Sequence, residues 1–417
     1  MKKIISLILS ISLIFVSLSF AAYATDEENA QYKNEYPIIF VHGLNGWGAD
    51  EGINSILPYW GGTTGDLTVY LKEQGYESYS ASVGPISSCW DRACELYARL
   101  TGARVDYGEY HSAQCGHSRY GRTYSEPLIK KWDNENKIHL IGHSFGGSTI
   151  RLLASLMAYG SEEEMQATTD GSISPLFTGD KQDYIKSVTA IATPHNSATM
   201  YYLVKKTHIW DALFLIDAYY TAAVGRSAIN GKLVDFHLEQ FGLTNTPGKS
   251  DAQPYLKAVK SFLNRTQDTC QYDLSPEGNK IMNEKIKICD NIYYFSYAFD
   301  TTYDAKIFNG RMPISKTNPI LAPVSFWIGF HKNFTDTFTG QAYDSTWQPN
   351  DGLCNTISET YPFTENHCDF DENNITSGIW NVMPVTKGDH GTAIGLLADK
   401  QKTHSFYLKL IEMINEL

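Results

Sequence analysis

Short runs of apolar residues recur along the chain, and stretches with helical spacing separate most of them. The runs are rich in β-branched and aromatic residues and predict strands at 36–41, 78–83, 138–141, 184–192 and 292–297. Apolar residues three to four positions apart predict helices within 60–75 and at 87–100, 148–159 and 405–417. Strands that alternate with helices are typical of an α/β fold, and the pattern places the chain in that class.

Two stretches depart from this alternation. Residues 102–124 are rich in glycine, histidine, tyrosine and arginine without a clear period, which predicts a long ordered loop that another group must hold in place. Residues 200–225 carry an apolar stripe at helical spacing, widened by Trp210 and Phe214. This helix belongs either to the core or to a movable lid with an apolar inner face.

The first 24 residues have the pattern of a secretory signal peptide. Lys2 and Lys3 precede an apolar run, and Ala22 and Ala24 supply the small residues of a cleavage site. A membrane anchor is the alternative, but the cleavage site and the acidic residues that follow it disfavour an anchor. The sequence therefore predicts a secreted, extracellular mature chain comprising residues 25–417.

The length of the mature chain allows either two domains or one large α/β domain with insertions. The segments at about 198–231 and 241–287 are interpreted as insertions that cap one sheet, so one domain is expected. Hydrophobic residues make up 42% and charged residues 19% of the chain, as in a protein with a true core. The net charge of −12 disfavours nucleic acid and anionic membranes as partners.

Residues 137–150 read KIHLIGHSFGGSTI, an apolar strand followed by a tight turn and a helix of small residues. The G-x-S-x-G pattern at 142–146, in this strand–turn–helix context, is the nucleophile elbow of α/β-hydrolases. It predicts a central, mostly parallel sheet flanked by helices, with the Ser144 hydroxyl exposed at the positive end of a helix. The alternative is a glycine-rich turn without chemistry, which the flanking strand and helix disfavour.

A serine nucleophile needs amide donors for the oxyanion, a base and an acid that orients the base. The loop after the first strand and the residue after the serine supply the donors in this fold, which points to the amides of Leu44 and Phe145. The order serine, acid, histidine favours His390 as the base, in a glycine-rich loop before the last helix. Asp351 is the preferred acid, and Asp389 is its main rival.

The chain resembles the secreted zinc-containing thermoalkalophilic bacterial lipases and their staphylococcal relatives. Most of the mature chain shares the resemblance, which rests on PIIFVHGLNGWG, VGPISSCWDRACELYARLTGARVDYG, HSAQCGHSRYGRTY, IGHSFGG, SISPLFTG, VTAIATPH, VDFHLEQFGL, YDLSPEG, NDGLCNT and GDH. The resemblance implies a triacylglycerol lipase with Ser144 as nucleophile, Asp351 as acid, His390 as base and a helical lid at 200–225. One departure is Phe145, because many relatives have glutamine after the serine.

The resemblance also implies a structural zinc site, whose ligands would be Asp91, His111, His117 and Asp268. From the sequence alone, two exposed loop histidines are the simpler interpretation of His111 and His117. With the resemblance, we expect the metal to clamp the 102–124 segment and the helix at Asp91 to the insertion near Asp268. The family also has a calcium site with a glutamate two residues after the base; threonine stands there in this chain, at Thr392, and the next acid is Asp399, so calcium is not expected.

Seven cysteines in an exported chain suggest disulfides and one unpaired thiol. If one zinc ion gathers its ligands, Cys115 and Cys270 come close, and we hypothesise a disulfide between them. Cys354 and Cys368 form a second candidate pair. Cys94, at an apolar helical position, is expected to be a buried free thiol.

The predicted function is therefore a secreted triacylglycerol lipase that acts at the lipid–water interface on acylglycerol substrates, without a stable protein partner. One alternative is a carboxylesterase or phospholipase of the same fold. Another is a non-catalytic binding protein on this scaffold, which the set of Ser144, Asp351 and His390 disfavours.

Overall fold

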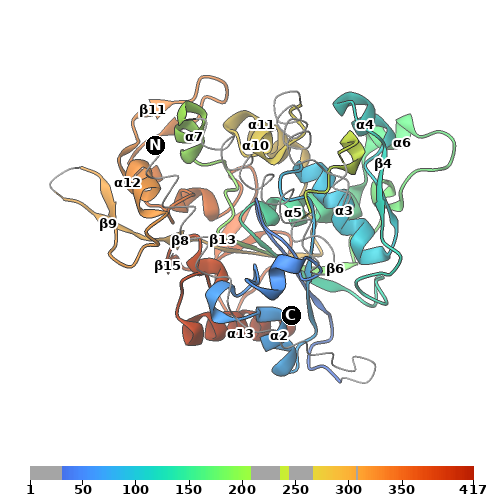
Figure 1. Cartoon of the computed structure of the whole chain (residues 1–417), viewed down its shortest axis with the longest axis horizontal. Coiled ribbons are helices and arrows are strands. Elements are labelled where there is room, and N and C mark those ends of the chain that lie inside the picture. The colour runs from blue at the N-terminus through green and yellow to red at the C-terminus, as the bar shows by residue number, and fades with distance from the viewer. Residues whose placement is uncertain (1–30, 208–234, 244–265, 307–308) are drawn as a thin grey trace. The chain divides into compact units, whose positions relative to one another are not determined.

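A computed structural model describes residues 31–207, 235–243, 266–306 and 309–417. Its centre is a sheet of seven strands in the order β13-β14-β7-β6-β5-β1-β2, and all its neighbouring strands are parallel (Figure 1). These strands are β1 (Ile38–Val41), β2 (Ser78–Ala81), β5 (Ile138–His143), β6 (Ile185–Ile191), β7 (Tyr293–Tyr297), β13 (His367–Asp369) and β14 (Trp380–Val382).

Helices and short strand pairs surround this sheet. The helices are α2 (Leu67–Glu73), α3 (Cys89–Thr101), α4 (Glu109–Cys115), α5 (Phe145–Tyr159), α6 (Glu162–Ala167), α7 (Met200–Thr207), α10 (Cys270–Asp273), α11 (Pro276–Lys285), α12 (Ala322–Phe330) and α13 (Lys400–Asn415). The strand pairs are β3 (Arg104–Asp106) with β4 (Tyr120–Thr123), β8 (Phe299–Asp300) with β15 (Thr386–Lys387), β9 (Thr302–Asp304) with β10 (Arg311–Pro313), and β11 (Phe334–Thr335) with β12 (Ala342–Tyr343).

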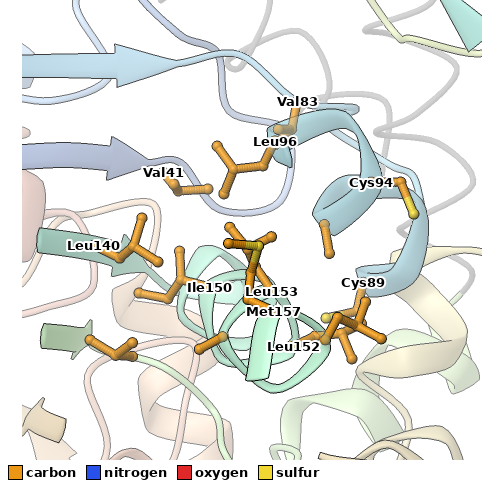
Figure 2. Close-up of a cluster of buried hydrophobic side chains, with 14 of the residues drawn as sticks. Val41, Val83, Cys89, Cys94, Leu96, Leu140, Ile150, Leu152, Leu153 and Met157 are labelled. Atoms are coloured by element: carbon orange, nitrogen blue, oxygen red, sulfur yellow. The ribbon is translucent and has the colours of Figure 1, made fainter. Parts of the chain in front are cut away.

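The sheet is buried on both faces because alternate residues of each strand enter different cores. In β1, Ile39 and Val41 join a cluster with α3 and α5, whereas Ile38 and Phe40 join a second cluster with α2 and α13. Figure 2 shows the first cluster, in which strand side chains meet the helix side chains of α3 and α5. The two cores fix the carboxyl ends of β1, β5 and β6 relative to one another.

The predicted strands, and the helices predicted within 60–75 and at 87–100, 148–159 and 405–417, are confirmed with shifts of a few residues at their ends. The prediction of a long loop at 102–124 is wrong, because β3, α4 and β4 lie within it. The sequence pattern does not predict α4, because only Ser112 of its seven residues is buried and the helix therefore has no apolar stripe. Its first turn is held instead by the Glu164 carboxylate, which accepts hydrogen bonds from the amides of Tyr110 and His111.

Several predictions fall wholly or partly outside the described residues. The signal peptide at 1–24 does, and so does most of the expected lid, of which α7 is the described part. Residues 244–265 of the second insertion also lie outside. In the described part of the chain, no helix combines the length and the apolar character that crossing a membrane requires.

The seven cysteines are free thiols, so the predicted Cys115–Cys270 disulfide is wrong. Cys270 is fully buried in the core beneath α3 and α5, where it neighbours the Arg92 guanidinium. Cys115 ends α4, and its Sγ lies 3.9 Å from Nδ1 of His111. Convergence of the four proposed metal ligands therefore does not bring these two thiols into the same surroundings.

The second candidate disulfide, between Cys354 and Cys368, is wrong as well. Cys354 is buried beside Asp351, and its amide donates to that carboxylate at 2.7 Å. Cys368 lies in β13 with its Sγ 3.7 Å from Oδ1 of Asn381. The prediction that Cys94 is a buried free thiol is confirmed.

We predict that Leu153→Ala lowers the free energy of unfolding by about 2–5 kcal/mol, because Leu153 is fully buried in the cluster of Figure 2 and its loss leaves a cavity. Urea denaturation measures this change. The matched control is Met165→Ala on the exposed face of α6, where a change within about 0.5 kcal/mol is expected. Equal losses in both variants would contradict the placement of the core.

Candidate active site and metal site

Ser144 occupies the sharp turn between β5 and α5, with φ 55° and ψ −128°. A non-glycine residue at such angles is strained and persists only where its surroundings leave no alternative. Two glycines make the turn possible: a Cβ on Gly142 would lie 2.5 Å from the Gly146 carbonyl carbon, and a Cβ on Gly146 would lie 2.2 Å from the Val41 oxygen. The strand, the turn and the helix therefore pack backbone against backbone around Ser144.

His390 and Asp351 are joined by two hydrogen bonds. The ring Nδ1 of His390 bonds to Oδ2 of Asp351, and the His390 amide donates to the Asp351 carbonyl at 2.8 Å. The Asp351 side chain is fully buried, and its Oδ1 accepts from the amides of Leu353 (2.8 Å) and Cys354 (2.7 Å). These donors fix the carboxylate, and the carboxylate in turn fixes the tautomer and the orientation of the imidazole.

The rival acid, Asp389, has other partners. Its Oδ2 accepts from the Asn318 amide at 2.7 Å, and its Oδ1 accepts from the amide and the hydroxyl of Thr392 at 2.9 and 3.0 Å. Asp389 therefore holds the loop that carries His390 in place, and Asp351 is the carboxylate that contacts the imidazole. Thr392 contributes a hydroxyl to this loop where a calcium site would need a carboxylate.

His143 links the turn at Ser144 to the loop of His390. The two rings have centroids 4.6 Å apart, and His143 Nε2 lies 3.2 Å from the His390 carbonyl. A carbonyl only accepts, so Nε2 carries the hydrogen of His143. Burial, followed by the charge of His390, holds the pKa of His143 well below its usual value, which leaves Nδ1 as an acceptor.

Tyr59 completes this chain of hydrogen bonds. Its hydroxyl lies 2.7 Å from His143 Nδ1, to which it donates, and its oxygen accepts from the Gly43 amide at 2.8 Å. Gly43 lies against Ser144, since a Cβ on Gly43 would be 2.8 Å from the Ser144 Cβ. One buried chain of hydrogen bonds therefore connects His390, the serine turn and the loop after β1.

The loop after β1 is also held by a buried cation. The Arg92 guanidinium donates to the carbonyls of His42 and Gly84 and to the Thr149 hydroxyl. Within the described part of the chain, the Leu44 amide in this loop has no hydrogen-bond acceptor. Phe145, the other expected donor, is the first residue of α5 and is fully buried. The positive end of a helix and a fixed loop thus flank Ser144.

Sequence patterns did not single out Tyr59, Arg92 or His143 for these roles. Tyr59 and Arg92 act through contacts with residues 8 to 84 positions away, which no spacing rule reveals. The chemistry of Arg92 could have indicated its role, because a charged arginine at a core-facing position of α3 must find hydrogen-bond acceptors.

The four predicted metal ligands converge, although they come from α3, α4, the turn after α4 and the segment before α10. Nε2 of His111 lies 3.2 Å from Asp91 Oδ1 and 3.4 Å from Asp268 Oδ1. Nε2 of His117 lies 3.2 Å from Asp268 Oδ2 and 4.0 Å from Asp91 Oδ1. Ligand atoms around a tetrahedral zinc ion are separated by about 3.3 Å, given metal–ligand bonds of about 2.0–2.1 Å.

The buried polar atoms of this cluster also fit a cation. Asp91 Oδ1, Asp268 Oδ2 and Nε2 of both histidines are buried without a hydrogen-bond partner among the described residues. Burial and the nearby Asp268 raise the pKa of Asp91 to about 6, as expected where two carboxylates are enclosed together. A divalent ion would satisfy all four groups. Supporting contacts orient two of them: Gln240 donates to Asp91 Oδ2 at 2.7 Å, and His117 Nδ1 donates to the Ser118 carbonyl at 2.9 Å.

Comparison with known proteins shows which family the chain resembles along its length. Residues 34–415 match the family described as "Lipase-like, C-terminal domain". A lipase from Staphylococcus epidermidis is 37% identical over 371 residues, which make up 88% of this chain and 51% of that protein. The chain thus spans about half the length of the curated relatives it matches.

Solved structures extend the likeness to the fold. Staphylococcus hyicus lipase matches with a TM-score of 0.79 and 33% identity, over 95% of this chain and 98% of the other. EstA from Clostridium botulinum matches with a TM-score of 0.80 and 35% identity, over 97% of this chain and 93% of the other. Together with the seven-stranded parallel sheet, these matches identify an α/β-hydrolase fold.

We predict that Tyr59→Phe lowers the free energy of unfolding by about 1–3 kcal/mol, because it leaves the Gly43 amide and the His143 Nδ1 buried without partners. Guanidinium denaturation of the purified protein measures the loss. Tyr110→Phe, on the exposed face of α4, is the matched control and should change stability by less than about 0.5 kcal/mol. A Tyr59→Phe variant as stable as the control would argue against this chain of hydrogen bonds.

Proposed function

We propose that this chain, which belongs to the lipase-like C-terminal domain family, is a triacylglycerol lipase that cleaves carboxylic esters with Ser144, His390 and Asp351. The observation that carries the proposal is the buried hydrogen bond between His390 and Asp351, in a loop linked by His143 to the strained turn of Ser144. A base oriented by a carboxylate, in a loop linked to the turn of a half-buried serine, suits nucleophilic attack on an acyl carbon.

The reaction would proceed in two steps. His390 takes the proton of the Ser144 hydroxyl as the serine oxygen attacks the ester carbonyl, and the amides of Leu44 and Phe145 bind the oxyanion. His390 then protonates the leaving alcohol, and water repeats the sequence on the acyl-enzyme. Asp351 stays ionised and stabilises the imidazolium that forms in each step. Each oxyanion donor contributes about 3–4 kcal/mol in other enzymes.

The surface near Asp351 supports a lipid substrate. The α12 helix has the sequence APVSFWIGF, yet only Ser325, Ile328 and Gly329 of it are buried. Leu321, just before this helix, packs against Gly352 beside the acid, and Phe326 is exposed on the helix. An apolar helix that is only partly buried, beside the active site, suits contact with the lipid–water interface. Of the lid proposed at 200–225, only α7 is among the described residues.

Two other functions remain as alternatives. A carboxylesterase or phospholipase of the same fold would prefer soluble short-chain or charged esters to emulsified triglyceride. A non-catalytic binding protein would fail to react with a serine-directed phosphonate. Hydrolysis rates for a triglyceride series and for soluble esters distinguish the proposed lipase from the first alternative. Phosphonate labelling followed by mass spectrometry distinguishes it from the second. The proposed secretion rests on the leader pattern at 1–24.

We predict that Ser144→Ala lowers kcat/KM for triglyceride by at least about a thousandfold, because the nucleophile is lost. Activity on an emulsified triglyceride is measured beside circular dichroism of the same sample, which should be unchanged. Ser172→Ala, in a surface loop, is the control and should keep full activity. Retention of activity in Ser144→Ala would remove the basis of the proposed reaction.

We propose that the metal at Asp91, His111, His117 and Asp268 is zinc with a structural role. Two imidazoles and two carboxylates suit tetrahedral zinc, and the ion would neutralise the enclosed carboxylates and tie α3 and α4 to the segment before α10. Neither His390 nor Asp351 belongs to this cluster, so no chemical step of the reaction uses the ion.

Removal of the metal should therefore lower thermal stability. We predict that a strong chelator lowers the Tm by at least about 5 °C, because a ligand bound only to the folded state stabilises it by several kcal/mol at saturation. Asp268→Asn should bind less zinc by elemental analysis and lose most of the chelator effect, whereas Glu372→Gln on the surface should behave like the parent protein. A Tm that is insensitive to chelator in the metal-loaded parent would exclude the structural role.

A further inference from the structure

A buried acid that the reaction scheme does not use lies beside Asp351. Glu359 ends a short 3₁₀-helix (Thr356–Glu359), and its side chain is fully buried. One polar side-chain atom from each of Asp351, Cys354, Glu359 and His390 lies within 4.8 Å of those of the other three. Two carboxyl groups and an imidazole thus share one enclosed space, although only one carboxylate is needed to orient His390.

The contacts of Glu359 require a proton. Its Oε2 accepts from the Phe299 amide at 2.7 Å, whereas Oε1 is buried and has no donor among the described residues. A carboxyl oxygen of Glu359 lies within 4.8 Å of one of Asp351, and the two carboxyl groups interact side chain to side chain. Two carboxylates cannot hydrogen-bond to each other, but a neutral carboxyl can donate to an ionised one. Burial, followed by the charge of Asp351, raises the pKa of Glu359 well above its usual value.

The donors around the two acids decide which one keeps the proton. Asp351 receives two backbone amides and the imidazole of His390, whereas Glu359 receives only the Phe299 amide. Three donors thus surround the Asp351 carboxylate, whereas enclosure with a single donor favours the neutral form of Glu359.

The other ionisable groups nearby do not reverse this assignment. Asp300 on β8 adds negative charge near Glu359, but Asp300 itself forms ion pairs with Arg311 at 2.9 Å and with Lys387 at 2.7 Å. Burial raises the pKa of the Cys354 thiol well above its usual value, so this neighbour is neutral, and so is His143 on the far side of His390. No cation among the described residues faces the Glu359 carboxyl directly.

We propose that Glu359 is a positioning residue: protonated at working pH, it donates a hydrogen bond to the Asp351 carboxylate and so fixes the acid that orients His390. This inference rests on the proposed function, because Asp351 and His390 must act as acid and base for it to matter. Glu359 touches no substrate atom in this scheme and acts only through Asp351.

The donated hydrogen bond has a consequence for pH dependence. It spreads the negative charge of Asp351 and makes that carboxylate a weaker partner for a proton on His390. Without the donor, Asp351 would hold the imidazolium form more strongly, and His390 would lose its proton only at higher pH. The acid limb of the pH profile of kcat/KM, which reports loss of that proton in the free enzyme, would then move upward.

The test compares Glu359→Gln with Glu359→Leu in the full chain. The amide of glutamine can accept from the Phe299 amide through its oxygen and donate to Asp351 through its nitrogen, so it reproduces both contacts of a neutral carboxyl. Leucine has a similar volume and neither contact. We expect the acid limb to stay within about 0.2 pH units in Glu359→Gln and to rise by about 0.5–1 unit in Glu359→Leu. Glu372→Gln is the matched surface control and should leave the limb in place.

Other outcomes overturn the proposal. An acid limb that falls in Glu359→Gln would mean that Glu359 is ionised in the parent, because the substitution would then remove a negative charge. An unshifted limb in Glu359→Leu would reduce Glu359 to a packing role. If Glu359→Leu does not fold, the Glu359→Gln profile decides together with the infrared band of a protonated carboxylic acid. The parent should show at neutral pH a component of that band that Glu359→Gln lacks, and a parent-minus-variant difference spectrum without this component refutes the proposal.

Failure of this inference can be told apart from failure of the proposed function. The infrared band reports the protonation of Glu359 whether or not the protein hydrolyses esters. Phosphonate labelling of Ser144 reports the nucleophile whether or not Glu359 is protonated. If the phosphonate labels Ser144 but the infrared band of protonated Glu359 is missing, only the role of Glu359 is rejected. If the band is present but Ser144 is not labelled, the proposed reaction is rejected.

Discussion

The turn at Ser144 is the constraint on which the rest of the site depends. A backbone with positive φ at a non-glycine residue costs about 1–3 kcal/mol and persists only when its surroundings over-determine it. Here the surroundings are β5, which is buried along its whole length between the two cores, and α5, which is buried in the first core except at its last residue, Tyr159. The gain in hydrophobic burial of these two elements far exceeds the local strain, at about 25 cal/mol for each Å² of apolar surface buried. The sheet therefore holds the serine in a position that the local sequence would not adopt by itself.

Buried polar groups then fix the positions of the residues around this turn. In a dry interior, an unpartnered donor or acceptor costs more than a hydrogen bond gains, so each buried group restricts the position of the next. His143 must satisfy both the His390 carbonyl and the Tyr59 hydroxyl, and Tyr59 must satisfy Gly43. A shift of any of these elements would leave at least one group without a partner. The site is rigid because its buried hydrogen bonds have few alternative arrangements.

The parts of the molecule that the sequence predicted are those in which local pattern and tertiary structure agree. The strand before Ser144 and the helix after it carry their own signals in apolar runs and glycines, and the pairing of His390 with Asp351 follows from chain order in this fold. Where long-range packing decides, the sequence was silent or misleading. The α4 helix has almost no buried face, Cys115 and Cys270 point to different neighbours, and Glu359 becomes notable only when folding encloses it beside Asp351.

The α3 helix connects the two sites that the structure assembles. Two consecutive residues of this helix contact different sites. Asp91 belongs to the candidate metal cluster, and Arg92 donates to the His42 carbonyl in the loop that contains Leu44. Ser88 caps the same helix through a hydrogen bond to the Asp91 amide at 3.1 Å, and Gln240 holds the Asp91 carboxylate from the other side. A metal ion that fixes Asp91 would therefore fix the axial position of α3, and with it the Arg92 guanidinium. A metal bound there would have no part in the chemistry but would still act on it, because the amide donor loop is only as well placed as the helix whose arginine holds it.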